Sequence, residues 1–176
     1  MTPFRMQPSP DPVLAYATGA CTLGLVLVAA GGKGIRAILL GDNTDTLVRD
    51  LRTRFPHAEL LASNDGCGGY LAEVIRLIEA PDHATALPLD PRGTAFQRRV
   101  WQALRTIPAG ETRSYADVAR CIGTPGAVRS VASACAANPI AVAIPCHRVV
   151  RADGALSGYR WGVVRKQRLL QQEAAR

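Results

Sequence analysis

Two short apolar runs near the start of the chain, separated by a glycine-rich segment, constrain its fold more than any other feature. Residues 22–29 and 35–40 are rich in branched aliphatic side chains, and residues 30–34 read Ala-Gly-Gly-Lys-Gly. Two such runs joined by a turn segment predict a β-hairpin. The glycines do not indicate a dinucleotide-binding loop, because that motif requires a helix after the glycines and an acidic residue further on.

Apolar residues then recur at helical spacing in two segments, 47–55 and 71–78. A hairpin followed by two amphipathic helices predicts a small α/β unit. Residues 80–93 contain three prolines and predict a linker, with a short extended piece around residues 87–89. We therefore expect a flexible amino terminus over residues 1–12, an α/β domain over 13–91 and a second domain over 92–176.

Capping residues predict three helices in the second half. Thr94 and Gln97 have the spacing of a capping box, and the helix that follows carries an apolar face over residues 96–107. Ser114 and Asp117 have the same spacing and predict the start of the second helix. These signals are local, so they locate the helix starts without reference to the rest of the fold.

A tight turn should separate the second and third of these helices. Gly123 can take the left-handed conformation that closes a helix. Thr124 can then cap the third helix with Pro125 at its first position, and Asn138 with the proline after it ends that helix. This order predicts a helix-turn-helix, although other helical hairpins share the spacing. Arg129 lies among small residues on one face, which would let the helix approach a nucleic acid groove closely.

Charge is distributed unevenly between the two halves. Residues 1–91 contain 7 basic and 10 acidic side chains, a net charge of −3, whereas residues 92–176 contain 14 basic and 4 acidic side chains, a net charge of +10. Such asymmetry indicates that the second half faces a polyanion, with DNA or RNA as the first candidates. A contribution to solubility alone is the alternative.

Residues 140–144 alternate like a half-buried strand and lead into Pro145, Cys146 and His147. A cysteine attacks carbon as the thiolate, so it needs a proton acceptor and nearby positive charge. His147, Arg148 and Arg151 could supply both. In an extended strand, however, neighbouring side chains point to opposite faces, so an inert buried cysteine beside a surface histidine remains the alternative.

The last predicted helix, from Val163 to about Ala174, places Glu173 on the same side as Leu169 and Leu170. A carboxylate on a core-facing side needs a partner, because burying it unpaired is costly. Orienting His147 as a base is one such role, and a surface position on a frayed terminus is the alternative. The glycine-rich loop 154–162 contains two aromatic residues, which could flank a flat ligand or pack on the core.

The five cysteines are widely spaced and show no zinc-finger pattern, so we predict neither a disulfide nor a structural metal. The amino terminus lacks the apolar stretch of a signal peptide, and no segment approaches the ~20 apolar residues of a membrane helix. We therefore expect a cytoplasmic protein with no membrane partner.

The segment Pro145-Cys146-His147-Arg148-Val149 resembles the active-site motif of the O6-alkylguanine-DNA alkyltransferases. The likeness extends from Gly93 to Glu173 and is strongest for the carboxyl-terminal half of bacterial adaptive-response (Ada) proteins. It continues more weakly through residues 37–42. The other matching positions are Phe96, Val100-Trp101, Ile107-Pro108-x-Gly110-Glu111-Thr112, Ser114-Tyr115, Arg129-x-Val131, Asn138-Pro139 and Ser157-Gly158-Tyr159-Arg160-Trp161-Gly162.

The resemblance implies an α/β (α+β) fold, with an amino-terminal ribonuclease-H-like domain followed by a helical, winged-helix-like domain that contains the helix-turn-helix. It implies irreversible transfer of an alkyl group from O6-alkylguanine, and from O4-alkylthymine, to the protein's own cysteine. The partner would be double-stranded DNA, bound through the minor groove by a monomer, with the damaged base flipped out of the stack. Each molecule would act once, without a cofactor.

By position, the resemblance implies that Cys146 accepts the alkyl group and that His147 removes its proton through a water molecule. Glu173 would orient His147, and Asn138 would brace the turn before the cysteine. Tyr115 would donate a proton to guanine N3 and contact the DNA phosphate.

The resemblance also implies DNA contacts and pocket walls. Arg129 would enter the duplex where the base has left, and the main-chain carbonyls of Cys146 and Val149 would hold the guanine amino group. The remaining DNA-contacting positions are Thr124, Ala127 and Val128, and the remaining pocket walls are Tyr159, Arg160 and Trp161.

Some features depart from the family pattern. Relatives that bind zinc in the first domain use cysteine and histidine ligands, and Cys21, Cys67, His57 and His83 form no equivalent set. The four-cysteine zinc domain of full adaptive-response proteins has no counterpart in this sequence, so we expect neither phosphotriester repair nor transcriptional activation from this chain itself. The alternative is that the chain is a fragment of a longer protein that has these activities. Trp161 occupies a position where some relatives have glycine, which predicts poorer handling of bulky alkyl groups.

Two other function classes compete with alkyl transfer. A cysteine hydrolase built from Cys146, His147 and Glu173 would need an oxyanion hole and would release its product. A non-catalytic lesion-binding module could use the same fold, but alkyltransferase-like proteins of that kind lack the acceptor cysteine. The cysteine at position 146 therefore favours transfer.

Overall fold

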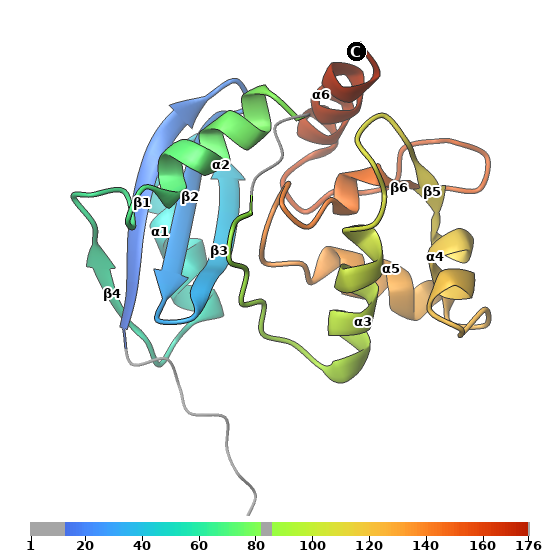
Figure 1. Cartoon of the computed structure of the whole chain (residues 1–176), viewed down its shortest axis with the longest axis horizontal. Coiled ribbons are helices and arrows are strands. Elements are labelled where there is room, and N and C mark those ends of the chain that lie inside the picture. The colour runs from blue at the N-terminus through green and yellow to red at the C-terminus, as the bar shows by residue number, and fades with distance from the viewer. Residues whose placement is uncertain (1–12, 82–85, 176) are drawn as a thin grey trace, which may run out of the picture.

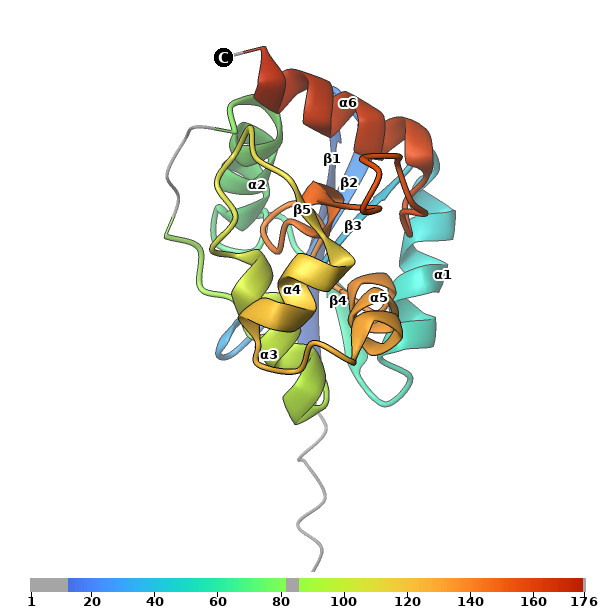
Figure 2. The ribbon, with the colours of Figure 1, turned by 90° about the vertical axis from the view of Figure 1, so that its right-hand side faces the viewer.

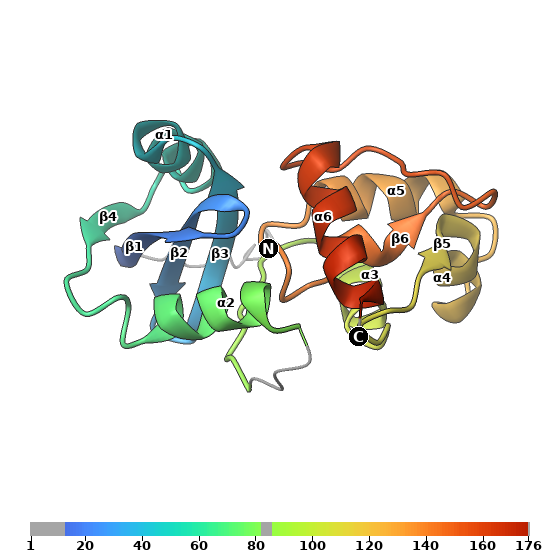
Figure 3. The ribbon, with the colours of Figure 1, turned by 90° about the horizontal axis from the view of Figure 1, so that it is seen from above.

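A computed structural model describes residues 13–81 and 86–175, which form two halves that lie side by side (Figures 1 and 3). The first half is a sheet with two helices, and the second is mostly helical. Among the described residues no helix has both the length and the apolar character needed to cross a bilayer. The elements in order are β1 (Val13–Cys21), β2 (Gly24–Gly31), β3 (Gly34–Gly41), α1 (Thr44–Arg54), β4 (Glu59–Ala62), α2 (Tyr70–Glu79), α3 (Ala95–Leu104), β5 (Arg113–Ser114), α4 (Tyr115–Cys121), α5 (Val128–Ala136), the 3-10 turn η1 (Cys146–Arg148), β6 (Val149–Val150) and α6 (Val163–Ala174).

The sheet has the strand order β3-β2-β1-β4, with β2 antiparallel to both β1 and β3 and with β4 parallel to β1. The predicted hairpin is confirmed as β2 and β3. Strand β1 escaped prediction because it is built largely of small residues. At Gly19, for example, a Cβ atom would lie 3.1 Å from Ile75 and 3.3 Å from Leu71 of α2, so the close approach of the helix favours a small residue.

Helices α1 and α2 cover opposite faces of the sheet (Figures 1 and 3). Strand β3 is almost wholly buried because both faces and its outer edge are covered. The edge bonds to the second half, with Ile38 N donating to Pro139 O (3.0 Å) and Ala141 N donating to Ile38 O (2.9 Å). Leu89 also forms a bridge to β3, which confirms the predicted extended piece of the linker.

Both predicted capping boxes are present. Thr94 Oγ1 accepts from Gln97 N (3.1 Å), and Gln97 Oε1 accepts from Thr94 N (2.9 Å). Ser114 and Asp117 make the same reciprocal pair at the start of α4. Helix α3 is then joined to α5 by Trp101, whose Nε1 donates to the main-chain oxygen of residue 134 at 2.9 Å.

The predicted start of the third helix of the second half is wrong by three residues. Gly123 takes the expected left-handed conformation, with φ of 76°. Helix α5 begins at Val128 rather than at Pro125, and Ala127 is its cap. Thr124 Oγ1 is buried and caps nothing, because Thr124 O accepts from Ala127 N and closes a turn before the helix.

The prediction of a strand over residues 140–144 is also wrong. Only Ile140 makes a bridge, to Ile38, and the rest of the segment is a compact turn. Val142 lies in the left-handed region with φ of 68°, which is rare for a β-branched residue. Apolar alternation suggested a strand, but these residues are apolar because the turn is buried between the two halves.

Candidate active site

Asn138 holds the turn that leads to Cys146. Its side chain is fully buried, and Oδ1 accepts from Ile140 N at 2.9 Å. Nδ2 donates to Ile144 O at 2.9 Å and approaches Cys146 Sγ at 3.3 Å. One amide therefore fixes both ends of the turn and also contacts the thiol. These bonds compensate for the strained backbone at Val142.

Cys146 begins the 3-10 turn η1 and is only 5% exposed. Burial raises the pKa of its thiol to about 11, although the hydrogen bond from Asn138 and the charge of Lys166 act in the opposite direction. The group is therefore a thiol at neutral pH and needs a base before it can act as a nucleophile.

Glu173 of α6 connects His147 and Arg148 in a buried cluster. Its Oε1 lies 2.8 Å from His147 Nε2 and accepts from Arg148 Nη2 at 2.8 Å. Burial raises the pKa of this carboxyl, but bonds and charges from His147 and Arg148 outweigh burial and lower it to about 2. Arg148 also donates to Ile107 O at 2.6 Å, so it neutralises Glu173 rather than the thiol.

The ionised carboxylate fixes the tautomer of His147. A carboxylate only accepts hydrogen bonds, so Nε2 of His147 must carry the hydrogen that points at Glu173. Nδ1 of the neutral ring is then unprotonated, and it has no hydrogen-bond partner in the described part of the chain. Burial lowers the pKa of His147, while Glu173 raises it. The ring can thus take a proton at Nδ1 and pass positive charge toward Glu173.

Lys166 is a site residue that the sequence reasoning missed. It is 1% exposed, and its Nζ donates to Val149 O at 2.7 Å and to Ser157 Oγ at 2.9 Å. It lies on the same side of α6 as Leu169 and Glu173, at intervals of three and seven residues. That spacing could have found it, because a lysine on a core-facing side needs buried partners as much as a glutamate does.

Cys146 lies at a cavity of about 560 Å³ formed wholly by the second half of the chain. Its walls come from the start of α4, from α5 and from the loop before α6. A hollow of this volume lies in the usual range for small-molecule sites and can hold a nucleobase. The lining residues are Tyr115, Ala132, Cys135, Ala136, Cys146, Arg151, Ser157, Gly158, Tyr159 and Arg160.

Two predicted pocket walls lie elsewhere. Trp161 does not line the cavity: it is buried and packs edge-to-face on Tyr159, with ring centroids 5.2 Å apart. The side chain of Val149 is also buried outside the cavity, and its carbonyl already accepts from Lys166. Tyr159 and Arg160 do line it, and Arg160 is held by a bond to the main-chain oxygen of Ala136 at 3.2 Å.

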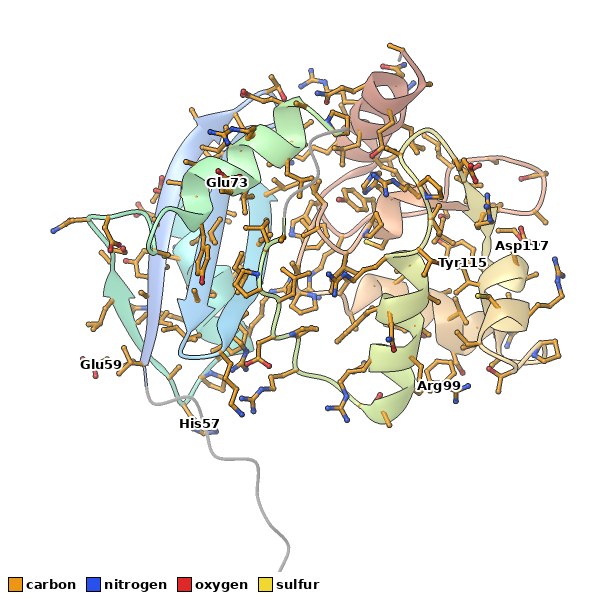
Figure 4. All side chains as sticks on the ribbon, in the orientation of Figure 1. His57, Glu59, Glu73, Arg99, Tyr115 and Asp117 are labelled. Carbon is orange, nitrogen blue, oxygen red and sulfur yellow. The ribbon has the colours of Figure 1, made fainter. Side chains whose placement is uncertain are left out.

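Tyr115 lies at the start of α4, on the cavity side of the helix (Figure 4). Its hydroxyl is hydrogen-bonded to Ser157 Oγ. Burial raises the pKa of Tyr115, so the phenol is protonated at neutral pH and can serve as a proton donor. Of the predicted catalytic side chains, Cys146 and Tyr115 share the cavity, Asn138 contacts the thiol, and His147 bonds to Glu173.

Helices α4 and α5 form the face that Figure 2 shows toward the viewer. Arg129, in the first turn of α5, is exposed and makes no bond with the described residues. Val128 beside it is 37% exposed, which is unusual for a large apolar residue. Thr124 and Ala127 are half-buried in the turn before α5. Arg129 and Val128 are thus accessible to a partner, and Thr124 and Ala127 are partly accessible, with the Thr124 hydroxyl turned inward.

Comparison with known proteins places this geometry in a family. Residues 95–175 match the model of the 6-O-methylguanine DNA methyltransferase, DNA binding domain. A methylated-DNA–protein-cysteine methyltransferase of Mycolicibacterium paratuberculosis is 40% identical over 161 residues, which cover 92% of this chain and 93% of the relative. The chain belongs to the 6-O-methylguanine DNA methyltransferase family. The matched region contains every predicted site residue, from Tyr115 to Glu173.

Two further members of the methyltransferase family extend the likeness. The bifunctional transcriptional activator/DNA repair enzyme Ada of Escherichia coli is 57% identical over 159 residues; these are 90% of this chain and 45% of Ada. The chain thus spans less than half the length of that relative. The crystal structure of Mycobacterium tuberculosis OGT in complex with DNA matches with a TM-score of 0.78 and 37% identity, covering 92% of this chain and 93% of OGT.

Proposed function

We propose that this chain repairs alkylated DNA directly, by irreversible transfer of the alkyl group from O6-alkylguanine to Sγ of Cys146. The observation that carries the proposal is the buried thiol at the cavity, held by Asn138 and followed in the chain by a histidine whose free ring nitrogen is a base. Membership of the 6-O-methylguanine DNA methyltransferase family supports the same chemistry. O4-alkylthymine is included as a second substrate.

The first step is removal of the thiol proton. With its pKa raised to about 11, Cys146 is protonated at rest. His147 Nδ1 takes the proton, through a bridging water molecule, and the imidazolium that forms is stabilised by the carboxylate of Glu173. Asn138 Nδ2 donates to the developing thiolate.

The second step is an in-line displacement at the alkyl carbon. Sγ of Cys146 forms the new carbon–sulfur bond as the bond from carbon to guanine O6 breaks. Tyr115 donates its proton to guanine N3, so guanine leaves as a neutral base. A thioether is a poor leaving group in water, so each molecule acts once. The balance of this reaction needs only the thiol, a base and an acid, and the proposal includes no cofactor or metal.

The DNA is bound by the second half of the chain. We propose that α5 enters the minor groove of the duplex, with Val128 beside the backbone and Ala127 and Thr124 at the start of the contact. Arg129, which bonds to none of the described residues, fills the gap that the flipped base leaves. The net charge of +10 over residues 92–176 supports this orientation. The flipped base then occupies the cavity between Tyr115 and Tyr159.

The finer fold description is also a proposal. The strand order and the helices on both faces of the sheet support a ribonuclease-H-like domain over residues 13–91. The two capped helices α4 and α5 support a winged-helix-like alkyltransferase domain over residues 92–176. We also propose that the chain acts as a monomer. The five cysteines are free thiols, and an acceptor thiol needs a reducing compartment such as the cytoplasm.

The test is intact mass spectrometry of the protein after reaction with an excess of duplex DNA that contains one O6-methylguanine. The proposal predicts a mass increase of one methyl group per molecule, which stops there and maps to the peptide that contains Cys146. The matched control is the same duplex with unmodified guanine, which should leave the mass unchanged.

The same experiment separates the competing functions. Product that exceeds one equivalent, with the protein mass unchanged, would indicate a hydrolase that turns over. DNA binding without any mass change would indicate a lesion-binding module. Either result would overturn the proposed transfer.

A further inference from the structure

A buried lysine is linked to Tyr115 through one hydroxyl group. Lys166 Nζ donates to Ser157 Oγ at 2.9 Å, and Ser157 Oγ is hydrogen-bonded to the hydroxyl of Tyr115. The second bond of Lys166, to Val149 O at 2.7 Å, fixes the ammonium group at the back of the cavity wall. Neither Lys166 nor Ser157 is needed for the transfer as described above.

The bond from Lys166 has a fixed direction. An ammonium group has donors only, so Ser157 Oγ accepts from Lys166. Either hydroxyl can donate in the bond between Ser157 and Tyr115, and the orientation that matters here is the one in which Ser157 donates to the oxygen of Tyr115. With its oxygen accepting from Ser157, the phenol of Tyr115 has its own hydrogen free to point into the cavity that it lines.

We propose that Ser157 and Lys166 are positioning residues that orient Tyr115 as the proton donor and replace the proton that it gives away. This inference rests on the proposed function, because it requires a leaving base that takes a proton from Tyr115. Ser157 and Lys166 do not touch the reacting atoms, and both act through the phenol.

The proton transfers balance. Tyr115 gives its hydrogen to the departing base, Ser157 gives its hydroxyl hydrogen to the phenolate oxygen, and Lys166 gives one hydrogen to Ser157. Before the displacement the charges are the thiolate, the ammonium of Lys166 and the imidazolium of His147, which is paired with the carboxylate of Glu173. Afterwards the thioether, the guanine and the amine of Lys166 are neutral, and the imidazolium remains paired with Glu173. The thiolate and the ammonium are both neutralised, which removes two poorly hydrated charges from a medium of low dielectric constant.

The burial of Lys166 makes the last transfer feasible. An ammonium group that is 1% exposed has lost most of its hydration, and burial lowers its pKa. The neighbouring thiols Cys146 and Cys135 act in the opposite direction when ionised. Once Cys146 has become a thioether, it can no longer carry the negative charge that stabilises the ammonium form of Lys166. Alkylation of Cys146 therefore favours release of a proton from Lys166.

The experiment is a set of single-turnover measurements with DNA that contains O6-methylguanine, over a range of DNA concentrations. The variants are Ser157→Ala, Ser157→Thr, Tyr115→Phe and the double variant Ser157→Ala/Tyr115→Phe. Lys166→Met is less informative, because it also removes a charge that favours the Cys146 thiolate. Thr53→Ala, which removes an exposed hydroxyl on α1, is the matched control.

Ser157→Ala should lower the rate constant at saturating DNA roughly 10-fold and leave the half-saturating DNA concentration unchanged, because the defect lies in proton donation. Ser157→Thr, which keeps the hydroxyl, should restore most of the rate. In the Tyr115→Phe background, the same Ser157→Ala change should alter the rate by less than about 2-fold, because the two residues act as one unit.

Three results would overturn the inference: an unchanged rate in Ser157→Ala, a loss in Ser157→Thr as large as in Ser157→Ala, or independent, multiplying losses in the double variant. Each of these requires that the unaltered protein methylates Cys146. Absence of methylation in the unaltered protein would instead contradict the proposed function, so the two failures are distinguishable.

Discussion

The two halves of the molecule differ in what they bury. Among the described residues, the sheet half buries one charged side chain, Arg36, whereas the helical half buries Asn138, His147, Lys166 and Glu173. Burying polar groups costs free energy unless they are hydrogen-bonded, and all four in the helical half are bonded. A domain that needed only stability would use apolar residues there. The concentration of buried polar groups therefore indicates that the helical half, residues 92–176, carries out the chemistry, and we call it the chemical half.

The sheet half has a supporting role in this comparison. Its strand β3 bonds to the turn over residues 139–141, immediately before Cys146, and its other contacts reach both ends of α6. Changes in the sheet should therefore alter stability without altering chemistry, and loss of the acceptor thiol should do the reverse. Four substitutions test this division, from the largest expected effect to the smallest.

Replacing Cys146 should have the largest effect on chemistry. Cys146→Ala removes the acceptor atom, so transfer of a radiolabelled methyl group from DNA should fall to background while DNA affinity is retained. Cys135→Ala is the matched variant, because Cys135 is a second buried thiol in the same cavity, with a pKa raised to about 12 by burial. The Cys135 thiol has neither the bond from the Asn138 side chain nor an adjacent histidine, so its loss should leave transfer intact.

The assignment of the acceptor fails if Cys146→Ala still becomes labelled, or if Cys135→Ala is inactive although folded and able to bind DNA. Peptide mapping of the labelled protein distinguishes the two thiols directly.

A core substitution in the sheet half should have the largest effect on stability. Leu39 in β3 is fully buried, and Leu39→Ala should lower the free energy of unfolding by about 4 kcal/mol, because it removes apolar contacts and leaves a cavity. Urea denaturation measures this loss. The transfer rate per folded molecule should stay unchanged at a temperature where the variant is folded.

The control for this loss is Leu61→Ala in β4, where the side chain is 47% exposed and the expected change is within about 0.5 kcal/mol. A folded Leu39→Ala protein with a much slower transfer rate would show that the sheet half shapes the chemistry, contrary to the division drawn above.

The parts of the fold that sequence could predict are those fixed by local interactions. The caps at Thr94 and Ser114 were predicted because the partner of each lies three residues further along the chain. Strand β1 was missed because its small residues suit the packing of α2, a contact that is distant in sequence. The turn before Cys146 was mistaken for a strand because Asn138 and the edge of β3 determine its shape.

The candidate site divides in the same way. The position of Glu173 on the core-facing side of α6 predicts a buried partner. In the structure that partner is His147. Arg148 is the second partner of Glu173, whereas the sequence suggests that it supplies positive charge near the Cys146 thiol. Adjacency to Cys146 in the sequence does not determine where the guanidinium group of a long side chain lies. Lys166 was overlooked because a lone lysine in a basic helix is usually solvated. Pairings between distant segments were the information that sequence lacked.

The third substitution tests the buried charge cluster of the chemical half. The pKa of Glu173 is about 2 in the folded protein and about 4.5 for an ordinary glutamate, so the ionised form stabilises the fold. This contribution, about 3 kcal/mol by linkage, is fully present above pH 4.5 and is lost as the pH falls toward 2. Glu173→Gln should therefore be less stable than the unaltered protein near neutral pH.

Urea unfolding at several pH values measures this effect. The difference in stability between the unaltered protein and Glu173→Gln should shrink between pH 4.5 and 2, because acid neutralises Glu173 in the unaltered protein. A difference that does not vary with pH would show that the carboxylate is not held in its ionised form by His147 and Arg148.

The smallest effect is expected at the junction of the two halves. Arg165 of α6 donates to Leu23 O in the sheet half at 2.9 Å and pairs with Asp42, whose side chain is 85% exposed. Because Asp42 is well hydrated, the main-chain bond should carry most of the effect. Arg165→Met keeps the apolar stem and should cost about 1 kcal/mol of unfolding free energy, with no change in transfer rate. Asp42→Asn should cost less. Slower transfer in folded Arg165→Met would instead show that the junction positions α6, and with it Lys166 and Glu173. The two halves would then act as one cooperative unit, and the division into a supporting half and a chemical half would be wrong.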